Sequence, residues 1–367
     1  MSRLADLIEQ LCPDGVEYRP LSELVRIRNG CDYKALSSGN VPVYGSGGVM
    51  THVSEALGEG PTVLIPRKGS LDNIFFVEGE FWTVDTIFYT EIASELDPKF
   101  FFYKMKTMRL SQMNEAAGVP SMNQKKLGRI QIPLPPLEVQ REIVRVLDQF
   151  TTLEAELEAE LEARQAQYEH YRNYLLSYDS LAARGPVEMV KLGELAHIAT
   201  GGRNTSDAVE GGAYPFYVRS QVPLSLNEYD FDESAVLTAG DGVGVGRVFH
   251  HVEGKYALHQ RAYRIVPNLE LLSSRYLYHV MVSQFGRYLE STVFHSSVTS
   301  VRKPMLERFP VAVPPMEEQD RVADVLDRFD ALVNDISSGL PAEIAARRAQ
   351  YEHYRDRLLS FPEKKAE

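Results

Sequence analysis

The heptapeptide AQYEHYR occurs twice in this chain of 367 residues, at Ala166–Arg172 and again at Ala349–Arg355. The likeness continues on both sides, because ARQAQYEHYRNYLLSY (163–178) matches ARRAQYEHYRDRLLSF (346–361). A solvated helix face does not require two tyrosines and a histidine in a fixed order. The repeated stretch therefore indicates a structural or functional role that both halves of the chain share.

Further matches show that the repeat covers whole halves of the chain. Upstream of the heptapeptide, LPPLEVQREIVRVLDQFTTL (134–153) matches VPPMEEQDRVADVLDRFDAL (313–332). The start of each half also pairs, GVEYRPLSELVRI (15–27) with PVEMVKLGELAHI (186–198). Self-similarity at this distance is typical of an internal duplication. The sequence predicts a globular block and a long helix, followed by a second block and a second long helix.

Each long helix is predicted from the residues that follow a Pro-Pro pair, a common stop ahead of a helix. Apolar residues then alternate spacings of three and four, which is the heptad pattern of a helix–helix seam. Two such stripes in one chain predict a coiled coil, and the alternative is two amphipathic helices that each pack on their own block. The predicted seam residues are Leu147, Phe150, Leu157, Leu161, Tyr168, Tyr171 and Leu175 in the first helix, and Leu326, Phe329, Ile336, Tyr351, Tyr354 and Leu358 in the second.

The second helix carries four extra residues relative to the first. Four residues make about one helical turn, so the apolar stripe can continue as a stutter. The stretch SSGLP (337–341) contains a glycine and a proline, and a kink or short break near Pro341 is an equal alternative.

The two blocks are predicted to be α+β domains. Alternating runs such as PTVLIPRKG (61–69) indicate strands with tight glycine turns. PKFFFYKMKTMRLSQM (98–113) and LLSSRYLYHVMVSQFGRYLEST (271–292) indicate helices. The predicted boundaries are 1–136 for the first block, 137–178 for the central helix, 179–315 for the second block, 316–362 for the C-terminal helix and 363–367 for a tail.

Composition and charge bound the class of protein. The chain has 44% hydrophobic and 25% charged residues, and it contains no run of about 18 apolar residues. Its two cysteines lie outside any metal-binding spacing. These features predict a cytoplasmic globular protein without a membrane partner.

The net charge of −12 argues against nucleic acid as a partner, but most of the negative charge lies in the predicted helices. Residues 137–178 carry −5 and residues 316–362 carry −4, against −2 for 1–136 and −1 for 179–315. The blocks are therefore compatible with DNA binding.

The sequence offers no catalytic residue and no metal site. A phosphate-binding loop, a nucleophile with a neighbouring base and the Asn/Asp-Pro-Pro-aromatic tetrad of amino-methyltransferases are all missing. GDGVGVG (240–246) resembles a dinucleotide fingerprint, but its glycine spacing favours a turn that leads into a strand. His250 and His251 are adjacent, and neighbouring strand residues point to opposite faces.

Two polar segments lie at matching positions, each just before the Pro-Pro start of a helix. GVPSMNQKKLGR (118–129) and HSSVTSVRKPMLER (295–308) combine hydroxyl or amide side chains with a basic pair. Such side chains bind phosphates or base edges, and the alternative is an ordinary polar loop that caps a helix.

Four shorter segments, YGSGG, PRKGS, YVRSQ and LHQRAYR, offer the same chemistry. Taken together, the candidate DNA-binding residues are Tyr44, Ser46, Arg67, Lys68, Ser121, Asn123, Gln124, Lys125 and Lys126 in the first block, and Tyr217, Arg219, Ser220, Gln221, His259, Gln260, Arg261, Ser297, Thr299, Ser300, Arg302 and Lys303 in the second.

The whole pattern resembles the DNA-specificity (S) subunit of type I restriction–modification enzymes. The resemblance rests on helices that begin PLPPLEVQREIVRVLDQF and AVPPMEEQDRVADVLDRF and end YRNYLLSY and YRDRLLSF, and on blocks that open GVEYRPLSEL and PVEMVKLGEL. It implies two target-recognition domains, each reading one half of a split DNA site. It also implies an antiparallel coiled coil that spaces the domains and holds two methyltransferase subunits.

In that family the methyltransferase subunits bind S-adenosylmethionine and methylate adenine, and restriction subunits use ATP and Mg²⁺. The resemblance thus implies a non-catalytic chain that binds no cofactor itself and whose partners are double-stranded DNA, methyltransferase subunits and restriction subunits. The competing hypotheses are a coiled-coil scaffold that binds proteins only, and the recognition module of another anti-phage system. The repeated tyrosines are expected in the helix seam, with the methyltransferase surface as the alternative.

Overall fold

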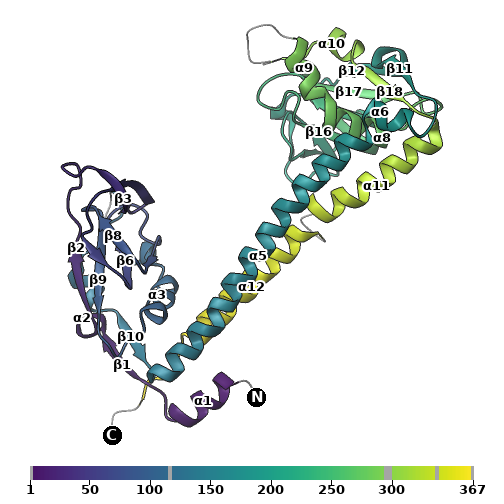
Figure 1. Cartoon of the computed structure of the whole chain (residues 1–367). Helices are drawn as coiled ribbons and strands as arrows, with labels where there is room; N and C mark the ends of the chain where they lie inside the picture. The colour runs from purple at the N-terminus through teal and green to yellow at the C-terminus, as the bar shows by residue number, and fades with distance from the viewer. Residues whose placement is uncertain (1–2, 115–117, 293–299, 335–338, 365–367) are drawn as a thin grey trace. The chain divides into compact units, whose positions relative to one another are not determined.

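The computed structural model of the chain describes residues 3–114, 118–292, 300–334 and 339–364. It divides into two compact units, one formed by residues 1–156 with 344–367 and the other by residues 157–343. The division falls inside the long helix α5 (Leu137–Leu175), so each unit holds one globular block together with parts of the long helices (Figure 1). The predicted α+β fold class is confirmed.

The block of the first unit is a small mixed structure of strands and short helices. Its elements are α1 (Arg3–Leu11), β1 (Glu17–Pro20), α2 (Leu21–Leu24), β2 (Val25–Asn29), β3 (Ser38–Gly45), β4 (Gly48–Val53), β5 (Gly58–Glu59), β6 (Thr62–Pro66), β7 (Phe75–Val77), β8 (Glu80–Thr83), β9 (Ile87–Ile92), α3 (Pro98–Thr107), the 3-10 turn η1 (Leu110–Met113), α4 (Gln124–Gly128) and β10 (Gln131–Leu134). The strands form sheets of order β2-β9-β6-β7, β4-β3-β8-β5 and β1-β10.

The block of the second unit repeats this arrangement with one larger sheet. Its elements are α6 (Tyr178–Ala182), β11 (Glu188–Lys191), α7 (Leu192–Leu195), β12 (Ala196–Thr200), the 3-10 turn η2 (Thr205–Asp207), β13 (Tyr214–Tyr217), β14 (Leu224–Leu226), β15 (Phe231–Ala239), β16 (Phe249–Leu258), β17 (Ala262–Pro267), α8 (Ser274–Val280), the π-helical turn η3 (Met281–Phe285), α9 (Gly286–Thr292), α10 (Lys303–Glu307) and β18 (Pro310–Val313). The strand orders are β12-β17-β15-β16-β13-β14 and β11-β18.

Strand pairing shows that the two blocks share one framework. In the first, β3 runs parallel to β8, and in the second, β13 runs parallel to β16. The antiparallel pair β6 and β9 corresponds to β15 and β17, and β1 with β10 corresponds to β11 with β18. The long strand β16 takes the place of the two strands β7 and β8, which Glu78 and Gly79 separate. The predicted internal duplication is confirmed.

The long helices differ slightly from their predicted limits. The central helix, predicted through residue 178, ends at Leu175, because the Ser177 hydroxyl accepts from the backbone N–H of Ser180 at 3.2 Å and starts the separate helix α6. The second long segment forms two helices, α11 (Met316–Asn334) and α12 (Leu340–Leu358). Gly339 lies outside both as a bend, and residues 335–338, including the predicted seam residue Ile336, fall outside the described part of the chain.

Each unit contains a helix–helix contact between the two halves of the duplication. In the first unit, α5 packs against α12 with the chains antiparallel, since Phe150 lies beside Tyr351 and Tyr354 while Glu154 pairs with Arg348 at 2.5 Å. In the second unit, α5 packs against α11. Both contacts bring a copy of the heptapeptide against the Pro-Pro helix of the other repeat.

The same aromatic cluster is built twice. The Phe150 ring lies 6.2 Å from the ring of Tyr351 and 5.9 Å from that of Tyr354. In the second unit the Phe329 ring lies 6.4 Å from Tyr168 and 6.1 Å from Tyr171. Leu147 and Leu326 are fully buried nearby, whereas Leu157, Leu161, Leu175 and Leu358 are half-buried.

Candidate nucleic-acid interface

In the first unit, three of the candidate segments meet at one end of the block. The loop after β6 pairs with the segment before α4 through a bridge between Lys68 and Ser121, and the Met122 N–H donates to the Arg67 carbonyl at 2.8 Å. Gly69 has a φ of +83°, and a Cβ placed there would lie 3.0 Å from the Ser46 hydroxyl oxygen. The loop after β3 therefore closes the same surface.

The side chains of this surface differ in how they are held. Lys68 and Ser121 are exposed, so both are available to a ligand. Arg67 is half-buried, with its guanidinium 5.9 Å from the centre of the Phe88 ring. Tyr44 is half-buried as well, and its ring lies 5.8 Å from that of Phe75.

Candidates around α4 mostly make local contacts. The Asn123 side chain caps the helix by accepting from the Lys126 N–H at 2.8 Å, and the Lys126 ammonium donates to the Met113 carbonyl. Gln124 donates to the Asn29 side chain at 3.2 Å, while Lys125 is exposed and lines an open pocket of about 320 Å³. Asn123 thus matches the capping alternative, and Lys125 remains the more accessible cation.

The second unit repeats the meeting of segments at equivalent positions. The loop after β15 pairs with the segment before α10 through a bridge between Asp241 and Ser300, and the Val301 N–H donates to the Gly240 carbonyl at 2.8 Å. The turn between β16 and β17 is tied to the same loop, because the Gly240 N–H donates to the Arg261 carbonyl at 2.8 Å. The matching pairs of residues, taken from the strand register, are Ser46 with Arg219, Lys68 with Asp241, Thr86 with Arg261 and Ser121 with Ser300.

Asp241 joins two of the candidate arginines. One carboxylate oxygen accepts from Arg219 Nη1 at 2.7 Å and the other accepts from Arg261 Nη1 at 3.0 Å. Burial alone would raise the pKa of Asp241, but the hydrogen bonds from Arg219 and Arg261 bring it below its ordinary value. The carboxylate is therefore ionised at neutral pH, and the three side chains together carry one positive charge.

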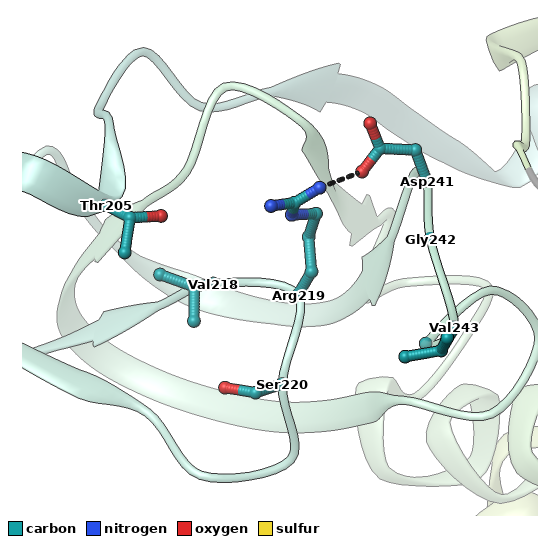
Figure 2. Close-up of a pocket in the computed structure, with 8 residues that line it drawn as sticks. Thr205, Val218, Arg219, Ser220, Asp241, Gly242 and Val243 are labelled. Carbon is teal, nitrogen blue, oxygen red and sulfur yellow. Dashed lines mark hydrogen bonds and ion pairs between the residues drawn. The ribbon is translucent and has the colours of Figure 1, made fainter.

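An open pocket of about 380 Å³ lies beside this cluster. Figure 2 shows the Arg219 guanidinium turned toward the Asp241 carboxylate, with Thr205, Ser220 and Val243 around it. The lining residues are Thr205, Val218, Arg219, Ser220, Asp241, Gly242, Val243 and Gly244. Val243 is 95% exposed on a loop in which Gly242 has a φ of +80°, so the wall formed by this loop is open to a ligand.

The remaining candidates of the second unit fall into two groups. His259 and Tyr217 belong to the framework: burial lowers the pKa of His259 and raises that of Tyr217. Ser220 donates to the Val222 carbonyl at 2.7 Å, and Gln260 bonds the Asn204 side chain. The exposed candidates include Ser220, Gln221, Gln260, Ser300, Arg302 and Lys303, whereas Ser297 and Thr299 lie outside the described residues.

Sequence reasoning missed Asp241 and the loop that follows it. An acidic residue gives no signal for DNA binding by itself, and GDGVGVG (240–246) predicts only a turn. The available signal was the duplication, because Asp241 and Gly242 match Lys68 and Gly69, and both glycines have positive φ.

Within the described ranges, no group of three or more His, Cys, Asp or Glu side chains could hold a metal ion. In the same part of the chain, no helix combines the length and apolarity needed to cross a membrane.

Comparison with known proteins identifies the family. The family model of the type I restriction modification DNA specificity domain matches residues 13–163 and again residues 185–346. The chain belongs to this family. The specificity domain thus occurs twice, once in each half of the duplication.

Relatives of the specificity family align with most of the chain. A putative type I restriction enzyme specificity subunit of Haemophilus influenzae is 29% identical over an alignment 379 positions long. The alignment covers 94% of this chain and 96% of that protein. The type I restriction enzyme EcoR124I/EcoR124II specificity subunit of Escherichia coli is 33% identical over 271 residues, covering 66% of this chain and 65% of that subunit.

Solved structures share the fold. The S subunit of a type I restriction–modification system from M. genitalium aligns with a TM-score of 0.63 at 14% identity, covering 94% of this chain and 96% of that one. The HsdS subunit from Thermoanaerobacter tengcongensis aligns with a TM-score of 0.52 at 17% identity, covering 95% and 97%.

Proposed function

We propose that this chain is the DNA-specificity subunit of a type I restriction–modification complex and that each of its two blocks reads one half of a bipartite DNA site. The observation that carries the proposal is a loop framework built twice with different side chains. Lys68 and Ser46 of the first unit correspond to Asp241 and Arg219 of the second. A conserved frame with exchanged polar groups is what two readers of different base sequences require.

The long helices set the distance between the two half-sites in this proposal. Helix α5 has 39 residues, which span roughly 58 Å at about 1.5 Å per residue. That length exceeds the roughly 34 Å that separate major grooves one turn apart on one face of DNA. The number of unread base pairs between the half-sites would follow from it. The domain boundaries that accompany this assignment are 1–136 and 179–315 for the two readers.

The partners follow from the family and from the duplication. A two-fold repeated frame offers two equivalent surfaces, which suits two copies of one partner. We infer that these partners are methyltransferase subunits, which bind S-adenosylmethionine and methylate adenine, and that restriction subunits with ATP and Mg²⁺ join the same complex. The chain itself would supply the DNA address and no catalytic group.

The test is reconstitution with the matching methyltransferase subunits. The isolated chain is expected to methylate no DNA, and the assembled complex is expected to methylate adenines within one bipartite sequence. Its affinity for DNA should fall steeply with salt, because phosphate contacts release counterions. Methylation by the isolated chain would contradict the non-catalytic assignment. A complex that assembles but binds no DNA would instead support the protein-scaffold hypothesis.

A further inference from the structure

Two side chains in the pocket of the second unit, Arg219 and Asp241, are not required for its loops to fold. The loop after β15 makes the same backbone bonds as the loop after β6, yet Asp241 stands where the first unit has Lys68. The loop after β13 likewise presents Arg219 where the first unit has Ser46. Because the framework forms with either set, the arginine and the carboxylate are available for selecting a ligand.

We propose that Arg219, held in place by Asp241, reads a guanine in the DNA half-site of the second block. This inference rests on the proposed function and names the base that this surface recognises. Arg219 makes the base contact, Asp241 is a positioning residue, and Arg261 shares the carboxylate without entering the pocket.

The Asp241 carboxylate fixes the orientation of the Arg219 guanidinium. Asp241 accepts from Arg219 at 2.7 Å and from Arg261 at 3.0 Å, so both of its oxygens are engaged. The side chain of Arg219 is 40% exposed, and an ion pair this accessible adds little to folding stability. Its effect is to restrict the rotamers of a long side chain before a ligand arrives, which lowers the entropy lost on binding.

One edge of the Arg219 guanidinium remains free to bind a base. A guanidinium has five N–H donors, and among the described residues Arg219 donates only from Nη1, to Asp241. The edge formed by Nε and Nη2 can therefore donate two parallel hydrogen bonds. Guanine presents two adjacent acceptors, O6 and N7, in the major groove, whereas adenine and cytosine place a donor there and thymine offers one acceptor, O4, beside a methyl group. This pairing selects guanine among the four bases.

Arg261 provides a matched control on the same carboxylate. Its side chain is 62% exposed, and it does not line the pocket that contains Arg219. An arginine in this position can meet a phosphate as a positive charge. Replacing it should weaken binding to all sequences alike, without changing which base is selected.

The experiment uses the full complex of this chain with its methyltransferase subunits. The methylated sequence is mapped first, and the half-site of the second block is identified by exchanging that block for another. Binding is then measured on duplexes in which one guanine of this half-site at a time is replaced by 7-deazaguanine, which lacks the N7 acceptor. The variants are Arg219→Gln, Arg219→Lys, Asp241→Asn and Arg261→Gln.

We expect DNA binding to respond to 7-deazaguanine at one guanine position of the half-site. For the unmodified chain, 7-deazaguanine at that position is expected to weaken binding roughly tenfold, since a good bidentate pair discriminates by about that factor or more. Arg219→Gln should bind the modified and unmodified duplexes nearly equally, because the guanidinium is absent. Arg219→Lys should show a reduced response, because an ammonium keeps the charge but lacks the planar pair of donors. Asp241→Asn should show a reduced response, and Arg261→Gln should keep the full response with weaker binding throughout.

Three results would overturn the inference: a second half-site without guanine on either strand, a full response retained by Arg219→Lys, or a response abolished by Arg261→Gln instead. Arg219→Lys keeps the charge, so the test stands even if Arg219→Gln fails to assemble. Failure of the proposed function is a separate outcome, in which the unmodified complex methylates no bipartite site.

Discussion

Two buried glutamines hold the blocks to the start of the long helices. Gln140 is fully buried, and its amide accepts from the Asp97 N–H at 2.7 Å and donates to the Glu95 and Pro135 carbonyls at 2.9 and 2.8 Å. Gln319 makes the corresponding three bonds in the second unit. Each side chain bonds three backbone groups, and its bond to a proline carbonyl, that of Pro135 or Pro314, is fully buried.

Replacing Gln140 by leucine tests this role. The change keeps the volume but leaves the Asp97 N–H and two carbonyls unpaired, so the free energy of unfolding should fall by about 2 kcal/mol. Urea unfolding followed by circular dichroism measures the loss. The control is Gln131→Leu, at an exposed position whose bond to Arg129 is 3.3 Å long, and it should change stability by less than about 0.5 kcal/mol. Equal effects of the two changes would refute the assignment.

Asp327 links a helix of the second block to α11. Its carboxylate accepts from Arg275 Nε at 2.7 Å and from His279 Nε2 at 2.6 Å. Burial raises the pKa of Asp327, but the hydrogen bonds from His279 and Arg275 outweigh burial and place it below its ordinary value of 3.8. A carboxyl group whose pKa is lower in the folded state stabilises the fold above the unfolded pKa and loses this effect as pH falls.

The lowered pKa of Asp327 predicts how the stability of an Asp327→Asn variant depends on pH. The variant should be less stable than the unmodified chain at about pH 7, and the difference should shrink as the pH falls below 3.8. Urea unfolding of both proteins across this range provides the measurement. A difference that stays constant with pH would show that the carboxylate charge makes no contribution.

Helix packing explains the heptapeptide repeat. Each copy places two tyrosines against one phenylalanine of the opposite repeat, Phe329 for the first copy and Phe150 for the second. Tyr171 and Tyr354 remain 42% and 38% exposed, so their rings contact the neighbouring helix while their outer edges face solvent. The pairing explains why the order of residues is kept in both halves.

A Phe150→Ala change separates the seam role from a role in partner binding. Loss of the contacts with Tyr351 and Tyr354 should destabilise the isolated chain by about 2 kcal/mol, less than for a fully buried phenylalanine. Phe329→Ala should act in the same way in the second unit. The control is Leu153→Ala, since Leu153 is 51% exposed on the same helix. Thermal unfolding of the chain without partners is the measurement, and an unchanged transition would assign the tyrosines to a partner surface.

The sequence predicted the elements whose signals are periodic or repeated. The apolar spacing predicted the long helices. Strand β6 was recognisable as a short apolar run, and its residues Val63, Leu64 and Ile65 are fully buried in the structure. The end of α5 was missed by a few residues, because Tyr178 continues the apolar stripe while Ser177 starts a new helix. Whether α11 and α12 were one helix stayed open, since Gly339 and Pro341 are compatible with a kink or a break.

The candidate site was only partly predictable, because it depends on which loops meet. The matching of Ser121 with Ser300 was visible from their distance to the helix starts. The clustering of Arg219 and Arg261 on Asp241 was not visible, since the three residues come from separate loops and the carboxylate has the unexpected sign. Asn123 illustrates the alternative role of such residues, because its side chain caps α4 while base contact by it stays a prediction.

Across both units, the duplication separates a shared frame from exchangeable contacts. Helix packing and the buried glutamines are the same in both units, whereas the loops at the candidate interface carry different polar groups. Modular reading follows directly from this division. Each block should determine its own half of the DNA site, and the helices should determine the spacing.

Exchanging residues 179–315 for the corresponding block of another specificity subunit tests whether each block reads its own half-site. The exchanged chain is assembled with the same methyltransferase subunits, and the methylated adenines of a whole genome are mapped by sequencing. We expect one half-site to change while the other half-site and the number of base pairs between them stay the same. A change in both half-sites, or in neither, would show that the two blocks do not read DNA independently.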